Sequence, residues 1–414
     1  MFDAWDVLLI GFVMPLIKPV WNLSNFQLGL FGTVTFVGMA IGALIGGSLA
    51  DAIGRKRVFA CAVLAYSLFS LASALAPSFQ WLLLLRFVVG LGLGATVPVV
   101  YAMVAEFMPL ALRGKALNLL DVFWGIGATL NGIVATLLAP YNNWRLLFLV
   151  MVAPALLIIG AIAYLPESPS FLIRKGRFDE ANSIIRRLIK RTGAEVGDWT
   201  LQESLGNEKI SHDNIISRFT KVLRFNWKVT LGLWIVVVVI FLHRYGVTMW
   251  LPSILVKGGY SHQKAFMAAG MLSFMGFIGI LASSWLVDIL GRKRFLMISS
   301  TLAAIFIVLF TKVLNITGYA QIAIMLYGLT AEPVIATLYT FISESYPTDL
   351  RATGFGCATM IARLTSAFLV SLVFGSLLWP ALGTSNTFIV VGCLVVGGMF
   401  VLNRLPETRG KALG

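Results

Sequence analysis

The sequence predicts an all-α membrane protein with twelve transmembrane helices, and its composition and apolar runs lead to this class. Of the 414 residues, 58% are hydrophobic and only 12% are charged, whereas a soluble domain is typically about 25% charged. The mean hydropathy is +0.89. Apolar runs recur along the chain, and each is long enough to cross a hydrocarbon core roughly 30 Å thick. We therefore expect a polytopic membrane protein.

The predicted spans form two sets of six, separated by a polar segment. The first set lies near 1–18, 26–50, 58–77, 80–105, 116–139 and 145–165. The second set lies near 229–256, 265–287, 295–311, 318–342, 353–379 and 386–404. We expect four parts in the chain, namely an amino-terminal bundle (1–165), a linker (166–228), a carboxy-terminal bundle (229–405) and a tail (406–414).

The linker and the charge balance predict the orientation in the membrane. Ala181, Ile184, Ile185 and Leu188 follow helical spacing within a basic segment, which predicts a short amphipathic helix facing water or, alternatively, lipid headgroups. The net charge is +14, and most Lys and Arg lie in loops on the linker's side of the membrane. Basic loops stay in the cytoplasm. We therefore expect a cell-membrane protein with both termini and the linker in the cytoplasm, and no nucleic-acid partner.

The sequence shows no pattern for catalysis or for a cofactor. Cys61, Cys357 and Cys393 lie in apolar spans without paired spacing, which is typical of small core residues and not of a disulfide or metal set. The GxGxG at 90–94 lies inside a span, so it is no nucleotide loop. We expect neither an enzyme nor a bound cofactor or metal.

One motif occurs at equivalent points of the two halves. "GGSLADAIGRKR" (46–57) follows the second span and "SSWLVDILGRKR" (283–294) follows the eighth. Duplication of a unit of six spans explains this repeat. The glycine permits a tight turn, the Asp can cap a helix or pair across the halves, and the cations hold the loop at the headgroups.

With these loops, four further motifs resemble the major facilitator superfamily of secondary transporters over nearly the whole chain. They are "RFVVGLGLGA" (86–95), "PESPSFLIRKGRFDEA" (166–181), "SESYPTDLRATGFG" (343–356) and "PETRGK" (406–411). The resemblance implies two pseudo-symmetric six-helix bundles that rock around a site near the bilayer midplane.

Three segments narrow the resemblance to one group of this superfamily. "FDAWD" (2–6), "AEFMPLALRGKALNLLDVFWGIG" (105–127) and "YGVTMWLP" (245–252) are most similar to aromatic-acid:proton symporters, nicotinate transporters, and synaptic-vesicle-related and organic-ion transporters. The seventh span lacks the glutamine-rich signature of sugar porters, which disfavours a sugar substrate without excluding it. The chain departs from its relatives at the acidic pair, which begins at residue 3 instead of well inside the first helix.

Buried charges in the first bundle predict a proton site. Asp3 and Asp6 share one helical face because they are three residues apart. The resemblance implies that an acid here lies near Arg86, and movement of an arginine changes whether a buried carboxylate holds a proton. Asp6 is the preferred proton carrier, and a fixed ion pair between the helices is the alternative. Glu332 precedes Pro333 in the tenth span and is either a second proton site or a gate partner.

Other polar residues within spans predict a substrate site. Asp121, Trp124 and Asn131 form a stripe of the fifth span that either lines a watery cavity, where Trp124 could stack on a ring, or packs against a neighbour. Either His243 or Arg244 faces this cavity, with Tyr245 or Trp250 nearby. His243 is alternatively a proton-transfer residue or a buried histidine with satisfied hydrogen bonds.

The eleventh span contains a further candidate for substrate binding, and the repeated loops and nearby helix ends contain candidates for a cytoplasmic gate. Organic-anion carriers resemble this chain in having Arg at the position of Arg363, and a guanidinium binds a carboxylate through two hydrogen bonds. A structural arginine is the alternative. Charge networks that close the cytoplasmic side are expected among Asp51, Arg55, Glu106, Arg113, Asp288, Arg292, Glu344 and Arg351.

These patterns together predict a proton-coupled symporter of a small organic anion, with nicotinate-like and benzoate-like acids included, that works by alternating access. Its partners would be the substrate, protons and membrane lipids, and we expect a monomer. The alternatives are a sugar or polyol porter, a uniporter, a drug exporter, or a sensor that keeps the fold without transporting.

Overall fold

The computed structural model describes residues 1–108, 110–151, 164–192, 215–346 and 348–408, together with a few positions between 152 and 163. All regular elements in these ranges are helices. The amino-terminal bundle holds α1 (Phe2–Val20), α2 (Asn25–Ile53), α3 (Arg55–Ser73), α4 (Phe79–Phe107), α5 (Leu110–Leu138), the short 3₁₀ turn η1 (Ala139–Tyr141) and α6 (Trp144–Leu149). Two small helices follow, α8 (Pro169–Arg174) and α9 (Phe178–Thr192).

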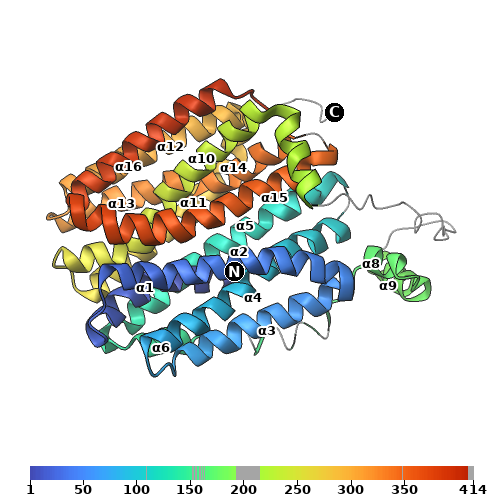
Figure 1. Ribbon diagram of the computed structural model, residues 1–414, viewed down its shortest axis with the longest axis horizontal. Coiled ribbons are helices and arrows are strands. Elements are labelled where there is room, and N and C mark those ends of the chain that lie inside the picture. Colours follow the sequence, from blue (N-terminus) through green and yellow to red (C-terminus); the bar gives the residue numbers. More distant parts are fainter. Residues whose placement is uncertain are drawn as a thin grey trace.

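The carboxy-terminal bundle repeats this arrangement. It holds α10 (Ile215–Lys257), α11 (His262–Leu290), α12 (Arg292–Lys312), α13 (Thr317–Ala331), α14 (Pro333–Glu344), α15 (Thr348–Leu364), the π-helical segment η3 (Thr365–Leu378) and α16 (Trp379–Arg404). Figure 1 shows the two bundles side by side, with α8 and α9 beyond one end of them. We call this the linker end, and the other the opposite end.

The described helices agree with the predicted fold class. Nine described stretches are long and apolar enough to cross a membrane. One of them, Thr353–Arg404, contains both the eleventh and the twelfth predicted spans, and its backbone turns between them at Gly383 (φ 74°). Another predicted span, α1, carries Asp3, Asp6 and Lys18, and the sixth lies only partly within the described residues. The predicted part boundaries stay a prediction.

Local sequence signals set the start of α2 and the helix ends at the two repeated loops. Ser24 and Gln27 form a reciprocal capping box that starts α2. Gly54 (φ 108°) and Gly291 (φ 88°) separate α2 from α3 and α11 from α12. Only glycine adopts such positive φ angles without strain. Both tight turns therefore depend on the glycine of the repeated motif.

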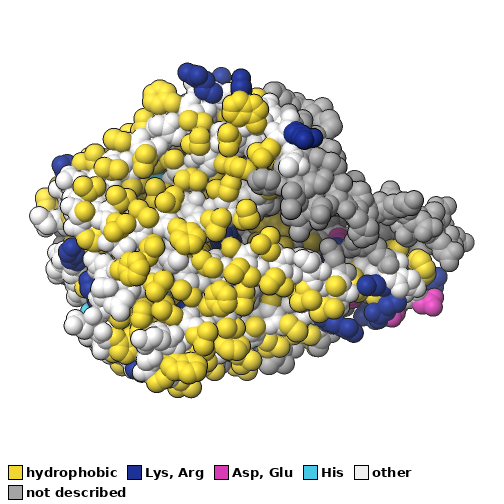
Figure 2. Space-filling model, in the orientation of Figure 1, with side chains coloured by type: hydrophobic (Ala, Val, Ile, Leu, Met, Phe, Trp, Pro, Cys, Tyr) yellow, Lys and Arg dark blue, Asp and Glu magenta, His cyan; other side chains and the backbone are white. Residues whose placement is uncertain are grey.

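The lateral surface matches a membrane environment. Figure 2 shows hydrophobic side chains over most of the visible face and Lys and Arg mainly at its margins. Large apolar side chains are exposed on the protein, including Leu137, Trp285 and Phe400. A soluble monomer rarely exposes so much contiguous apolar surface.

The two bundles contact each other mainly at the opposite end. There α2 packs against η3, α5 against α11, and α1 against α10. Thr33 of α2 donates a 2.7 Å hydrogen bond to the Ala367 carbonyl of η3. Gly132 of α5 lies directly against Gly270 of α11. Close backbone approach through small residues is the usual packing mode of membrane helices.

Candidate functional site

A cavity of about 780 Å³ lies between the two bundles, lined by residues of α1, α2, α4, α5, α10, α11, α14 and α15. Its walls come mainly from the linker-side parts of these helices, such as Ala43 of α2, Tyr101 of α4 and Phe355 of α15. Since the bundles meet at the opposite end, this conformation holds its cavity toward the linker end.

The cavity wall combines aromatic and charged side chains. The aromatic residues are Tyr101, Trp124, Tyr245, Tyr339 and Phe355. The charged residues are Asp3, Asp121, Arg244, Glu332 and Arg363. Most other lining residues are aliphatic, so the polar groups are few and separate. Such a wall suits a ligand with one flat apolar part and one charged group.

Arg244 and Glu332 form a buried ion pair in this wall. Nε of Arg244 lies 3.0 Å from Oε2 of Glu332, and Nη2 donates to the same oxygen. The guanidinium lies 4.6 Å from the ring centroids of both Trp124 and Tyr245. Trp124 belongs to the other bundle, so this cation–π contact also joins the two halves.

The position of Glu332 depends on a helix break and on a glycine. Pro333 has no N–H to donate and divides the tenth span into α13 and α14. A Cβ at Gly276 of α11 would lie 2.1 Å from Cγ of Glu332. Only glycine at 276 therefore leaves room for this glutamate beside Arg244.

Arg363 and Asp121 are the two charged residues of the wall without an ion-pair partner among the described side chains. Arg363 is half-buried and makes no described hydrogen bond. Asp121 is also half-buried, and its Oδ1 accepts a 3.2 Å hydrogen bond from the Tyr101 hydroxyl. Asp3, by contrast, pairs with the amino-terminal ammonium group at 3.1 Å.

A second ion pair lies inside the amino-terminal bundle, away from the cavity. Nη1 of Arg86 lies 2.6 Å from Oδ1 of Asp6, and both side chains are 0% exposed. Arg86 also donates to Ser70 and Ser73, and its guanidinium stacks 4.7 Å from the Phe148 ring centroid. Oδ2 of Asp6 is buried and accepts no hydrogen bond in the described part of the chain. The predicted proximity of Asp6 to Arg86 therefore has a defined geometry here.

Three predicted substrate residues lie outside the cavity wall. Asn131 donates a 3.1 Å hydrogen bond to the Trp5 carbonyl and holds α1 against α5. Trp250 is buried and donates to the Val370 carbonyl. His243 is buried with its ring edge toward Tyr327. Of the adjacent pair on α10, it is thus Arg244 that faces the cavity.

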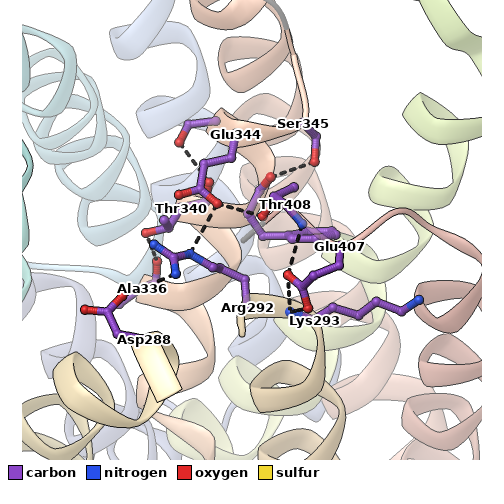
Figure 3. A network of polar contacts seen from close by, with 11 residues as sticks. Asp288, Arg292, Lys293, Ala336, Thr340, Glu344, Ser345, Glu407 and Thr408 are labelled. Atoms are coloured by element: carbon purple, nitrogen blue, oxygen red, sulfur yellow. Dashed lines mark hydrogen bonds and ion pairs between the residues drawn. The ribbon is translucent and has the colours of Figure 1, made fainter. Parts of the chain in front are cut away.

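The repeated loops hold matching polar networks within each half. In the first half, Arg55 pairs with Glu106 and donates a 3.0 Å hydrogen bond to Ser168, while Glu167 accepts from the Arg55 backbone N–H. In the second half, Arg292 lies between Asp288 and Glu344 at 3.2 Å from each (Figure 3).

The second network also uses the end of α16 and the following residues. Thr408 donates a 2.6 Å hydrogen bond to Glu344, and Glu407 accepts from the Lys293 backbone N–H at 3.2 Å (Figure 3). The side chains of Asp51, Arg113 and Arg351 lie outside the described part of the structure. All described contacts here join groups of one half, so a closed cytoplasmic gate between the halves stays a prediction.

Sequence reasoning missed several residues of these sites. Glu167 and Ser168 of "PES" and Glu407 and Thr408 of "PET" occupy equivalent places, and the two matching tripeptides were a usable signal. Tyr101, Tyr339 and Phe355 gave no such signal, because isolated aromatics in apolar spans are most often packing residues.

Comparison with known proteins identifies what the chain is similar to. The model of the sugar (and other) transporter family matches residues 5–414. The niacin transporter NiaP of Acinetobacter baylyi is 34% identical over 100% of this chain and 93% of its own length. The gallate transporter of Pseudomonas putida is 30% identical over 95% of this chain and 86% of its own length.

A solved structure shares the fold at low sequence identity. The xylose transporter XylE from E. coli, in a partially occluded inward open conformation, superimposes with a TM-score of 0.76. The alignment covers 99% of this chain and 98% of that one at 19% identity. This likeness supports the architecture described above and carries no information on the substrate.

Proposed function

Since this chain belongs to the sugar (and other) transporter family of major facilitator membrane proteins, we propose that it carries small aromatic carboxylates across the cell membrane together with protons. The observation that most directly supports this proposal is the position of Arg363. Its guanidinium lines a cavity with aromatic walls and has no anionic partner among the described side chains. An ionised side chain at this depth is costly unless an anion compensates it. A substrate carboxylate would supply that anion through two parallel hydrogen bonds.

The rest of the wall suits an aromatic ring better than a sugar. A sugar needs many donors and acceptors for its hydroxyl groups, whereas the lining here is largely aliphatic and aromatic. Trp124, Tyr245 and Tyr339 offer ring faces and edges near the charged groups. Relatives named for niacin and for gallate, both aromatic acids, support the same substrate class.

Proton coupling is proposed for the Asp6–Arg86 pair. A proton on Asp6 removes the charge of its carboxylate and weakens the ion pair with Arg86. The hydroxyl groups of Ser70 and Ser73 would still accept hydrogen bonds from the Arg86 guanidinium. Because the pair is fully buried in this conformation, proton exchange would belong to another stage of the transport cycle. The pair would thereby couple protonation to movement of α1 against α4.

The proposal also covers the orientation of the protein in the membrane and the closing of its linker end. Basic loops favour a cytoplasmic position for the linker end, both termini and α8–α9, and with this orientation the structure would face inward. The loop networks around Arg55 and Arg292 would meet across the two halves when the linker end closes. The transporter would work as a monomer.

The test is ligand-dependent stability of the purified protein followed by counterflow in proteoliposomes. A ligand that binds the folded state raises its melting temperature. Nicotinate and gallate should stabilise the protein and exchange across the membrane, whereas nicotinamide and xylose should do neither. A sensor that does not transport would bind without exchange.

Arg363→Lys tests the carboxylate contact itself. Lysine keeps the charge but loses the planar fork, so nicotinate binding should weaken by about 1–3 kcal/mol. Arg294→Lys, at an exposed arginine of α12, is the matched control and should bind as wild type. If only xylose stabilises the wild type, a sugar porter is the better assignment.

A further inference from the structure

The charged side chains of the cavity wall bear on how substrate binding is coupled to a proton. Arg244 and Glu332 neutralise each other as a pair, and Asp3 adds a carboxylate to the wall. Arg363 and Asp121 remain as one cation and one carboxylate on the same wall, neither with an ion-pair partner among the described side chains. Arg363 is therefore the one described wall cation left to offset these carboxylates, and a carboxylate ligand would add one more negative charge.

Asp121 is the group best placed to respond to this added charge. It comes from α5, opens onto the main cavity, and also lines a smaller adjoining cavity of about 360 Å³ beside α1 and α3. Tyr101 is its only described hydrogen-bond donor, with 3.2 Å between the oxygens. Glu332, in contrast, is held by two hydrogen bonds from Arg244. Removing the charge of Asp121 breaks no ion pair among the described residues.

Two carboxylates in one largely apolar cavity cannot both stay ionised at low cost. A substrate carboxylate paired with Arg363 adds a negative charge to the cavity wall that Asp121 already shares with Asp3. The other charged and titratable groups that line the same two cavities are Asp3 on α1, Tyr66 on α3, Tyr101 on α4, Arg244 and Tyr245 on α10, Glu332 and Tyr339 at α14, and Cys357 and Arg363 on α15. Among these, Arg363 is the cation without a described carboxylate partner.

We propose that Asp121 is a proton site inside the substrate cavity, and that it takes up one proton when a substrate carboxylate binds to Arg363. The ionised substrate and one proton from the cavity water enter together, Asp121 becomes a neutral acid, and the total charge of the site is unchanged. Repulsion between the substrate carboxylate and the ionised Asp121 carboxylate would thus couple substrate binding to proton uptake. This inference rests on the proposed function and adds a second proton site to Asp6.

Proton uptake on binding tests this coupling directly. Nicotinate is titrated calorimetrically into the purified full-length protein in buffers of different ionisation enthalpy, which gives the number of protons taken up per ligand bound. Wild type should take up about one proton wherever Asp121 is ionised in the ligand-free protein, and log affinity should then fall by about one unit per pH unit. Nicotinamide, which is neutral and lacks the carboxylate, should show neither binding nor proton uptake in the same titration.

Asp121→Asn should bind nicotinate without proton uptake and independently of pH. At alkaline pH its affinity should exceed that of wild type by roughly 5- to 150-fold, the usual range for coupled ligands. Asp179→Asn, at an exposed carboxylate of α9, is the control and should take up the same number of protons on binding as wild type. Persistent uptake in Asp121→Asn, or loss of nicotinate binding by a folded Asp121→Asn protein, would overturn the proposal.

A second variant keeps the test decisive if Asp121→Asn does not fold. Tyr101→Phe removes the hydroxyl that donates to the ionised carboxylate, so the pH at which proton uptake begins should move upward. An unchanged pH profile in Tyr101→Phe would also contradict the proposal. If nicotinate fails to bind wild type at all, the carboxylate substrate itself is wrong, which is a different result from binding without a role for Asp121.

Discussion

The contact between Gly132 and Gly270 should control which end of the transporter is open. A Cβ at Gly132 would lie 2.3 Å from Cα of Gly270, whereas carbon atoms pack at about 3.5–4.0 Å. Gly132→Ala therefore requires α5 and α11 to separate by roughly 1.2–1.7 Å. Overpacking of this kind costs about 1–3 kcal/mol. A free-energy change of about 1.4 kcal/mol corresponds to a tenfold change in an equilibrium constant. The population of the conformation open at the linker end should therefore fall roughly 5- to 150-fold relative to the conformation open at the opposite end.

Cys357 is a native reporter of this change because it lines the cavity. Cys61 and Cys393 are exposed and would be replaced by alanine. The labelling rate of Cys357 by a polar maleimide should then fall in Gly132→Ala. Gly270→Ala should have a smaller effect, because its nearest contact would be 3.2 Å.

Gly397→Ala is the matched control for these variants. Gly397 lies on α16, and a methyl group added there would have no neighbouring atom within 4 Å, so its labelling should equal that of the parent. If Gly132→Ala labels as fast as Gly397→Ala, the glycine contact does not hold the opposite end closed.

Three other variants probe coupling, packing and the loop network. Asp6→Asn should abolish uphill, proton-driven nicotinate uptake and leave counterflow partly intact, because exchange needs no net proton movement; wild-type accumulation under a pH gradient would remove Asp6 from coupling. Gly276→Ala places a methyl group 2.1 Å from Cγ of Glu332, so it should destabilise the protein by about 1–3 kcal/mol, and an unchanged melting temperature would show that Glu332 can move freely. Glu344→Gln should lower the melting temperature more than Asp288→Asn, because Glu344 is 21% exposed and Asp288 is 73% exposed; equal effects would speak against a stabilising loop network.

The sequence was sufficient for the helices and for the charges that need partners. Apolar run length predicts each span, and the repeated loop motif predicts two equivalent halves. The cost of ionised groups in hydrocarbon singled out Asp6, Arg86, Arg244 and Arg363 before their surroundings were known.

The partners of individual side chains were harder to predict, because they depend on the rotation of one helix against another. Asn131 shares a stripe with Asp121 and Trp124, yet it turns to the Trp5 carbonyl of α1 while the other two line the cavity. Trp250 reaches the Val370 carbonyl in the π-helical segment, whose wider backbone no apolar pattern reveals. Spacing along one helix therefore predicts a shared face, and packing between helices decides what that face meets.

Uptake of nicotinate into proteoliposomes under an imposed pH gradient tests the central claim most directly. An acidic outside and an alkaline inside should drive accumulation of nicotinate above equilibrium in wild type, and dissipation of the gradient with a protonophore should abolish it. Xylose should not accumulate under the same gradient. Accumulation of xylose without nicotinate, or nicotinate entry that ignores the gradient, would contradict proton-coupled transport of an aromatic carboxylate.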